Sequence, residues 1–80
     1  MAHRTHGPEI ARLRLERGFT LQRLADEAAI SRSHLGKIEL GERGASAPAL
    51  KRLAIVLGVP VSQIAEMPLD RGRRARANAA

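Results

Sequence analysis

The stretch from residue 20 to residue 41, TLQRLADEAAISRSHLGKIELG, is the part of this 80-residue chain that most restricts its fold. Thr20 is a good helix N-cap, and Ser31 is a second one after a break in the apolar pattern. Gly41 occupies the position at which a glycine commonly ends a helix. Between the two caps, apolar residues recur at the i, i+3, i+4 and i+7 spacing of one helix face, at Leu21, Leu24, Ala25 and Ala28. The stretch therefore predicts two short helices joined by a tight turn, the second of them over Arg32–Leu40.

The second of these helices buries only about one residue per turn and has an outer face without acidic residues. Its inward residues are Leu35 and Ile38. Its outer positions are Arg32, Ser33, Gly36 and Lys37, with His34 beside them. A short helix with a basic and polar outer face, braced by another helix, has the parts of a helix-turn-helix recognition element.

The same capping and periodicity rules predict three further helices. They are expected over residues 9–17, from the Ser46 cap to Leu57, and in a short last helix over residues 61–66. No strand pattern and no internal repeat is present. The predicted fold class is all-α, a compact five-helix bundle over residues 8–69.

Both ends of the chain have a polar composition without apolar periodicity. Residues 1–7 are expected to form a flexible arm, and the arginine-rich residues 70–80 a disordered basic tail. His3 and His6 are three residues apart, but without cysteine or a nearby carboxylate pair they are better explained by a polar arm than by a metal site. The tail either follows the phosphate backbone of a nucleic acid as a nonspecific electrostatic helper or serves as a solubilising end.

Composition excludes several classes of protein. The chain contains no cysteine, so a disulfide framework is excluded, and no apolar run approaches the roughly 18 residues of a membrane span. The amino terminus lacks the apolar segment of a signal peptide, so a cytoplasmic protein is expected. Of the net charge of +6, the four arginines of residues 71–80 supply +4, whereas residues 1–70 hold ten Lys and Arg against eight Asp and Glu, or +2. The position of the cations in the folded body therefore matters more than the high isoelectric point.

The order of residues along the chain resembles the Xre family, the Cro and phage-repressor type of helix-turn-helix domain. The resemblance covers residues 10–65 and rests on Gly18, Thr20, Leu24-Ala25, Ile30-Ser31-Arg32, Leu35, Ile38-Glu39, Gly41, Leu53-Ala54 and Leu57-Gly58-Val59. It implies a five-helix bundle that places its third helix in the major groove of DNA, usually as a two-fold dimer.

The resemblance also implies roles for individual residues. Arg32, Ser33 and Lys37 would contact base edges, while backbone phosphates would be contacted from around Thr20, His34 and Arg43. The guanidinium of an arginine at the helix start has the fork geometry that pairs with guanine. The predicted DNA-binding set is Thr20, Ser31, Arg32, Ser33, His34, Gly36, Lys37 and Arg43.

Each member of this set also has an ordinary interpretation as a solvated or capping residue of a helix surface. Gly36 in particular either allows close approach of the backbone to DNA or is a tolerated weak point, which costs a helix about 1 kcal/mol relative to alanine.

Four other positions carry expectations from the same resemblance. The first position of the second helix, often glutamine in the family, is Leu21, so no side-chain phosphate contact is expected there. The turn position often held by glycine is Ala29, which costs roughly 1 kcal/mol if the turn requires a positive φ. Arg14 and Glu39 are expected to form a structural ion pair between the first and third helices.

The predicted function is a sequence-specific DNA-binding transcriptional regulator of the repressor kind, without cofactor, metal or catalytic activity. Two copies would bind a palindromic operator on double-stranded DNA, and the apolar residues Val59, Val61, Ile64, Met67 and Leu69 would either form the homodimer surface or close the core. The alternative is a protein-interaction module, such as an antitoxin or anti-regulator, with a protein partner. A nucleoid-coating protein is disfavoured by the mild charge of the body.

Overall fold

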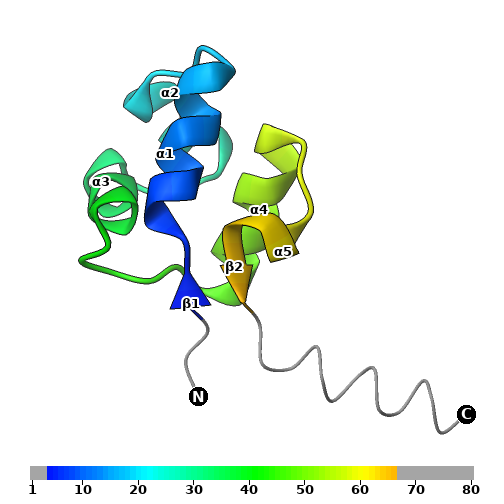
Figure 1. Cartoon of the computed structure of the whole chain (residues 1–80). Coiled ribbons are helices and arrows are strands. Elements are labelled where there is room, and N and C mark those ends of the chain that lie inside the picture. The colour runs from blue at the N-terminus through cyan, green and yellow to red at the C-terminus, as the bar shows by residue number, and fades with distance from the viewer. Residues whose placement is uncertain (1–3, 67–80) are drawn as a thin grey trace, which may run out of the picture.

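The computed structural model describes residues 4–66, which form five helices and two short strands (Figure 1). Along the chain they are β1 (Arg4–Thr5), α1 (Gly7–Glu16), α2 (Leu21–Glu27), α3 (Arg32–Leu40), α4 (Ala47–Leu57), α5 (Val61–Ile64) and β2 (Ala65–Glu66). Helix α1 packs against α3 on one side and α5 on the other, while α2 packs against both α3 and α4 (Figure 1). The predicted five-helix architecture is confirmed, and α3 has the bounds expected from the sequence. Within residues 4–66, no helix has the length and apolar character needed to cross a membrane.

The core is aliphatic, as the near absence of aromatic residues requires. Its largest fully buried side chains come from every helix: Ile10, Leu13, Leu24, Leu35, Ile38, Leu50, Leu53, Leu57 and Ile64. Phe19 is partly buried and packs against this cluster. Burial of each such side chain contributes roughly 1.5–3 kcal/mol, so the periodic apolar positions of the sequence account for the packing of the five helices. Of the two roles open to Ile64, dimer surface or core closure, the structure shows the second, since this side chain is fully buried.

Three hydroxyl side chains cap helices as predicted. Thr20 Oγ1 accepts a hydrogen bond from the Arg23 amide at 3.0 Å, which begins α2. Ser31 Oγ accepts from the His34 amide at 3.0 Å, and Ser46 Oγ caps α4. Such a cap typically contributes about 1 kcal/mol by satisfying an amide that the helix leaves unpaired. The caps therefore fix where α2, α3 and α4 begin.

The turn between α2 and α3 requires a left-handed backbone at Ala29, which has φ 60°. We expect Ala29→Gly to raise the free energy of unfolding by up to about 1 kcal/mol, because glycine adopts this conformation without a Cβ clash. Chemical denaturation would measure the change. The neighbouring Ala28→Gly is the matched control: Ala28 is buried at a negative φ, so glycine there should destabilise. A less stable Ala29→Gly variant would contradict the assignment of strain to this turn.

The amino-terminal segment differs from the expected flexible arm. Strand β1 pairs with β2 in antiparallel register, with Arg4 opposite Glu66 and Thr5 opposite Ala65. The His6 amide then donates to the Ile64 carbonyl at 2.8 Å. Strands of two residues show no alternation that a sequence pattern can reveal, because they form only when residues 4–5 and 65–66 meet.

The ends of α1 and α5 shift accordingly. Helix α1 begins at Gly7, two residues before the predicted start, and α5 ends at Ile64, where the chain becomes extended. Residues 1–3 and 67–80, which include His3 and the predicted basic tail, lie outside the described residues.

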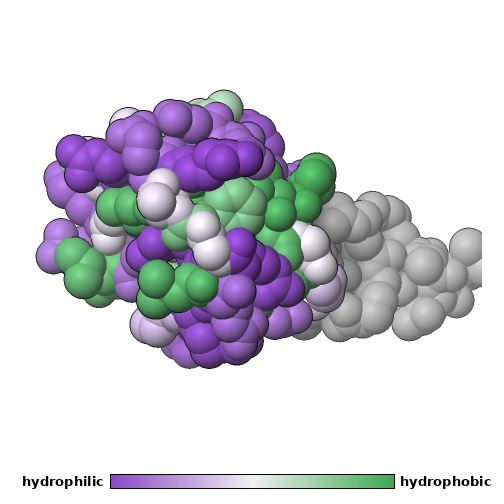
Figure 2. Space-filling model, turned by 90° about the horizontal axis from the view of Figure 1, so that it is seen from above, coloured by the Kyte–Doolittle hydropathy of each residue, from purple (hydrophilic) through white to green (hydrophobic). Residues whose placement is uncertain are grey.

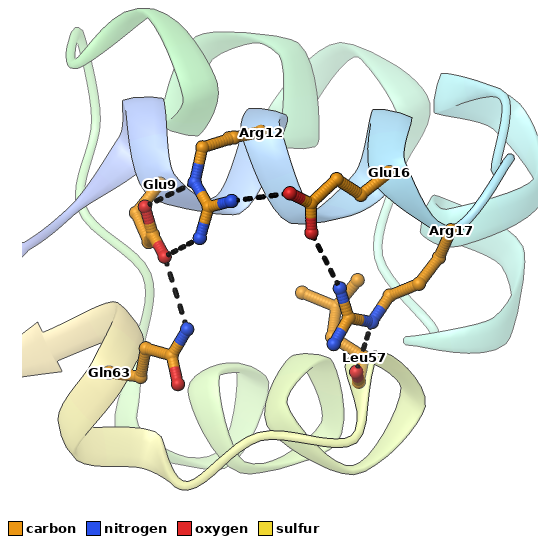
Figure 3. A network of polar contacts seen from close by, with 6 residues as sticks. All are labelled: Glu9, Arg12, Glu16, Arg17, Leu57 and Gln63. Carbon is orange, nitrogen blue, oxygen red and sulfur yellow. Dashed lines mark hydrogen bonds and ion pairs between the residues drawn. The ribbon is translucent and has the colours of Figure 1, made fainter.

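A polar network on the surface joins α1 to the end of α4 and to α5 (Figure 3). The Arg12 guanidinium donates to both Glu9 and Glu16, and Gln63 donates to Glu9 at 3.1 Å. Arg17 completes the link by donating to the Leu57 carbonyl at 2.6 Å. The hydrogen bonds from Arg12 and Gln63 lower the pKa of Glu9 to about 2, so this carboxylate stays charged in moderately acidic solution.

Candidate nucleic-acid interface

Helix α3 turns one face away from the bundle. Leu35 and Ile38 are fully buried, whereas Arg32, Ser33 and Lys37 are exposed. This division follows from the sequence, since a helix that buries about one residue per turn leaves the rest of its circumference to solvent. The three side chains predicted to contact base edges are therefore accessible, and no other part of the described chain covers them.

An open hollow of about 240 Å³ lies beside this face. Five residues of the predicted set line it: Ser31, Ser33, His34, Lys37 and Arg43. No acidic residue is among them. The hollow joins the first turns of α3 to the loop that follows the helix, and its two permanent cations make it suited to an anionic group.

Arg43 reaches the hollow because the chain reverses direction at the end of α3. Gly41 has φ 82°, a left-handed conformation that ends the helix. The amides of Glu42 and Arg43 then donate to the Lys37 carbonyl at 2.9 and 3.4 Å. These bonds hold the start of the loop against the last turn of the helix.

The other predicted residues lie outside the hollow. Arg32 is exposed on α3, and Thr20 is exposed at the start of α2, where its hydroxyl caps the helix. Gly36 is only half-exposed, because it faces α2: a Cβ built on it would lie 3.7 Å from Leu21 Cδ2. Leu21 is partly buried and packs against the core cluster.

The Lys and Arg side chains of the described residues fall into two groups. Five arginines are paired within the fold: Arg12 by Glu9 and Glu16, Arg14 by Glu39, Arg17 by the Leu57 carbonyl, Arg23 by Glu27, and Arg52 by the Ala28 carbonyl. Within residues 4–66, the other five have no side-chain hydrogen bond or ion pair: Arg4, Arg32, Lys37, Arg43 and Lys51. Three of these five lie together on α3 and the loop after it, a segment whose acidic residues are Glu39, which is paired with Arg14, and Glu42.

The predicted ion pair between Arg14 and Glu39 is confirmed. Arg14 Nε and Nη2 donate to the two carboxylate oxygens of Glu39 at 2.7 and 3.1 Å, and Nη1 donates to the Phe19 carbonyl at 3.1 Å. The two side chains are only 15% and 9% exposed. This bidentate pair fixes α3 against α1, so that the opposite face of α3 is held outward.

Sequence reasoning missed Arg52 as a support of this surface. Its Nε donates to the Ala28 carbonyl at 2.7 Å, at the end of α2. An arginine on α4 thereby satisfies a carbonyl that the end of a helix leaves unpaired, immediately before the turn that leads into α3. Only the packing of α4 against α2 could reveal this contact, because the two residues are 24 positions apart.

The sequence pattern of the helix-turn-helix family HTH_3 matches residues 10–64, a range that includes α2, the turn and α3. The chain belongs to this helix-turn-helix family. Within residues 4–66 of this helix-turn-helix domain, no three His, Asp or Glu residues are grouped as a metal site would require.

Three similar proteins illustrate the relationship. The domain is 41% identical over 59 residues to the uncharacterized HTH-type transcriptional regulator RghRB of Bacillus subtilis, covering 72% of this chain and 42% of that protein. It is 36% identical over 59 residues to the HTH-type transcriptional regulator SutR of Escherichia coli, covering 74% of this chain and 33% of SutR. The crystal structure of SinR of Bacillus subtilis, the master regulator for biofilm formation, in complex with DNA, superposes with a TM-score of 0.67 and 33% identity, over 71% of this chain and 95% of that chain. The helix-turn-helix domain thus spans less than half the length of the two curated relatives.

Proposed function

We propose that this helix-turn-helix domain is the DNA-reading part of a sequence-specific transcriptional regulator that places α3 in the major groove. The observation that carries the proposal is the group of three cations, Arg32, Lys37 and Arg43, on the exposed face of α3 and its loop, whose side chains have no partner among residues 4–66. DNA presents a dense row of negative charges, which such a face attracts. The names of the two curated relatives and the DNA complex of SinR support the same function.

The geometry supports a division of roles along α3. Arg32 lies in the first turn and outside the hollow, where its fork of N–H groups can pair with guanine O6 and N7. His34 and Arg43 line the hollow and would contact backbone phosphates, with Thr20 at the start of α2 as a further phosphate contact. Lys37 would reach either a phosphate or a second guanine, and Ser33 a base edge.

We further infer that two copies bind a palindromic operator. One short helix covers only about half a turn of DNA, and a second copy on a half-site one helical turn away would double the contact. Of the apolar residues predicted for the dimer surface, Val59 and Val61 are only half-buried, and Met67 and Leu69 lie outside the described residues. A regulator of this kind would act in the cytoplasm as a repressor.

A protein-interaction module is the second candidate. In the described part of the chain, three large apolar residues are strongly exposed: Leu15, Leu40 and Ile55 at 67%, 75% and 78%. Seen from above, apolar patches lie between the hydrophilic residues of the surface (Figure 2). A solved complex of SinR with the SinI protein supports such a role for similar domains. Binding to mixed genomic DNA at rising salt would separate the two candidates, because a DNA reader retains selected sites at physiological salt.

Selection of bound sites from random DNA is the direct test of the proposal. We expect one enriched sequence with two symmetric half-sites. Recovery of no preferred sequence, together with complete loss of binding at physiological salt, would contradict the regulator function.

Substitution of Arg32 is expected to change both affinity and sequence preference. Arg32→Ala should weaken binding to the selected site by roughly 1–3 kcal/mol and relax the preference at one base pair of each half-site, because a bidentate contact to guanine is lost. Titration of the selected site and of single-base variants by fluorescence anisotropy would measure both effects. Arg12→Ala removes an equal charge from the α1 surface and should leave the preference intact. If Arg32→Ala distinguishes the single-base variants as well as the wild type does, Arg32 faces solvent or a phosphate and not a base.

A further inference from the structure

The loop that carries Arg43 is held at its two ends and also at Ala45 between them. Its start bonds to the Lys37 carbonyl, and its end is the Ser46 cap of α4. Between these points the amide of Ala45, a buried residue, donates to Thr5 Oγ1 at 3.2 Å. A Cβ built on Gly44 would lie 3.6 Å from the same oxygen. Thr5 therefore lies against the middle of the loop, although it is 40 positions away in the sequence.

Thr5 is itself held in place by strand pairing. It belongs to β1 and pairs with Ala65 of β2. The next two residues are tied down as well: the His6 amide donates to the Ile64 carbonyl at 2.8 Å, and Gly7 is buried against the backbone of Ile38. The segment that carries the Thr5 hydroxyl is therefore fixed in two places. It is bonded to the carboxyl end of the described fold, and it packs against the last turn of α3.

We propose that Thr5 is a positioning residue for Arg43, which sets the loop so that the guanidinium lines the hollow beside α3. The inference rests on the proposed DNA-binding function and adds a residue outside the predicted DNA-binding set. The loop needs such a contact because Gly41 and Gly44 give its backbone wide conformational freedom. Without the Thr5 bond, the loop samples more conformations and Arg43 loses part of its preorganisation for a phosphate.

The test uses the full chain and the site obtained by selection, with Thr5→Val, Arg43→Ala and the double variant. Valine keeps the shape and strand preference of threonine but removes the acceptor, so the variant should remain folded with a somewhat lower Tm, and its DNA binding is measured well below that Tm. We expect Thr5→Val to weaken DNA binding about threefold to tenfold, as for loss of one hydrogen bond, and to make the dependence of log Kobs on log salt less steep. Arg43→Ala should reduce that slope by about 1.

The double variant distinguishes positioning from general support of the fold. If Thr5 acts through Arg43, Thr5→Val should weaken binding little further when Arg43 is already alanine. Thr5→Ser keeps a hydroxyl and should restore wild-type affinity and salt slope. Additive losses in the double variant, wild-type binding by Thr5→Val, or wild-type binding by Arg43→Ala would each overturn the inference. Failure of the wild-type chain to select any DNA would instead contradict the proposed function.

Discussion

Gly7→Ala is expected to lower the free energy of unfolding by about 3 kcal/mol, a large share of the stability of so small a domain. A Cβ at this position would overlap the carbonyl oxygen of Ile38 and would lie 2.9 Å from that of Glu39. Both are backbone atoms at the end of α3, so they cannot move aside as the tip of a side chain can. The first turn of α1 would have to separate from α3. Thermal and chemical denaturation would measure the loss.

Gly36→Ala is the matched control for this substitution. Its Cβ would meet only Leu21 Cδ2 at 3.7 Å, an ordinary contact distance. Alanine is favoured over glycine inside a helix by about 1 kcal/mol, so this variant should be as stable as the wild type or more stable. Equal stability of the Gly7→Ala and Gly36→Ala variants would show that α1 and α3 are not in close backbone contact.

Glu39→Ala is expected to cost about 3 kcal/mol of stability, because it leaves the Arg14 guanidinium partly buried beside no opposite charge. Glu39 accepts two hydrogen bonds from Arg14 and is only 9% exposed. The effect should fall mainly on folding, since the pair lies on the side of α3 that faces α1. Urea denaturation gives the free energy, and DNA titration well below Tm gives the affinity.

Two further variants check this interpretation. Arg23→Ala breaks an exposed pair with Glu27 and should change stability by less than about 1 kcal/mol. Replacing both Arg14 and Glu39 with apolar residues of similar size should recover much of the loss, because no buried charge is then left alone. Retained thermal stability in Glu39→Ala would refute a structural role for the pair.

The helices could be predicted because their determinants are local. The hydroxyl caps at Thr20, Ser31 and Ser46 lie next to apolar stripes of helical period, and Gly41 marks the end of α3. The strained turn at Ala29 could be anticipated only through the resemblance to a family with glycine there. The exposure of the α3 face follows from the same pattern, since few of its residues can reach the core.

The remaining features depend on contacts between distant residues. The hollow requires Arg43 to fold back beside His34, and β1 requires residues 4 and 66 to meet. In the sequence, Gly7 looks like part of a polar arm. It is buried in the structure because a residue without a side chain allows the backbone at the end of α3 to approach closely. No spacing rule along the chain describes such an approach, which only the assembled bundle creates.

The pairing of β1 with β2 has a consequence for how this domain can be joined to other polypeptides. Because Arg4 lies opposite Glu66, the first and last described residues are neighbours at one corner of the fold (Figure 1). A domain whose two ends are neighbours can be inserted into a surface turn of a host protein, because the host backbone does not have to be stretched between them. The same compact module can therefore be appended, prepended or inserted.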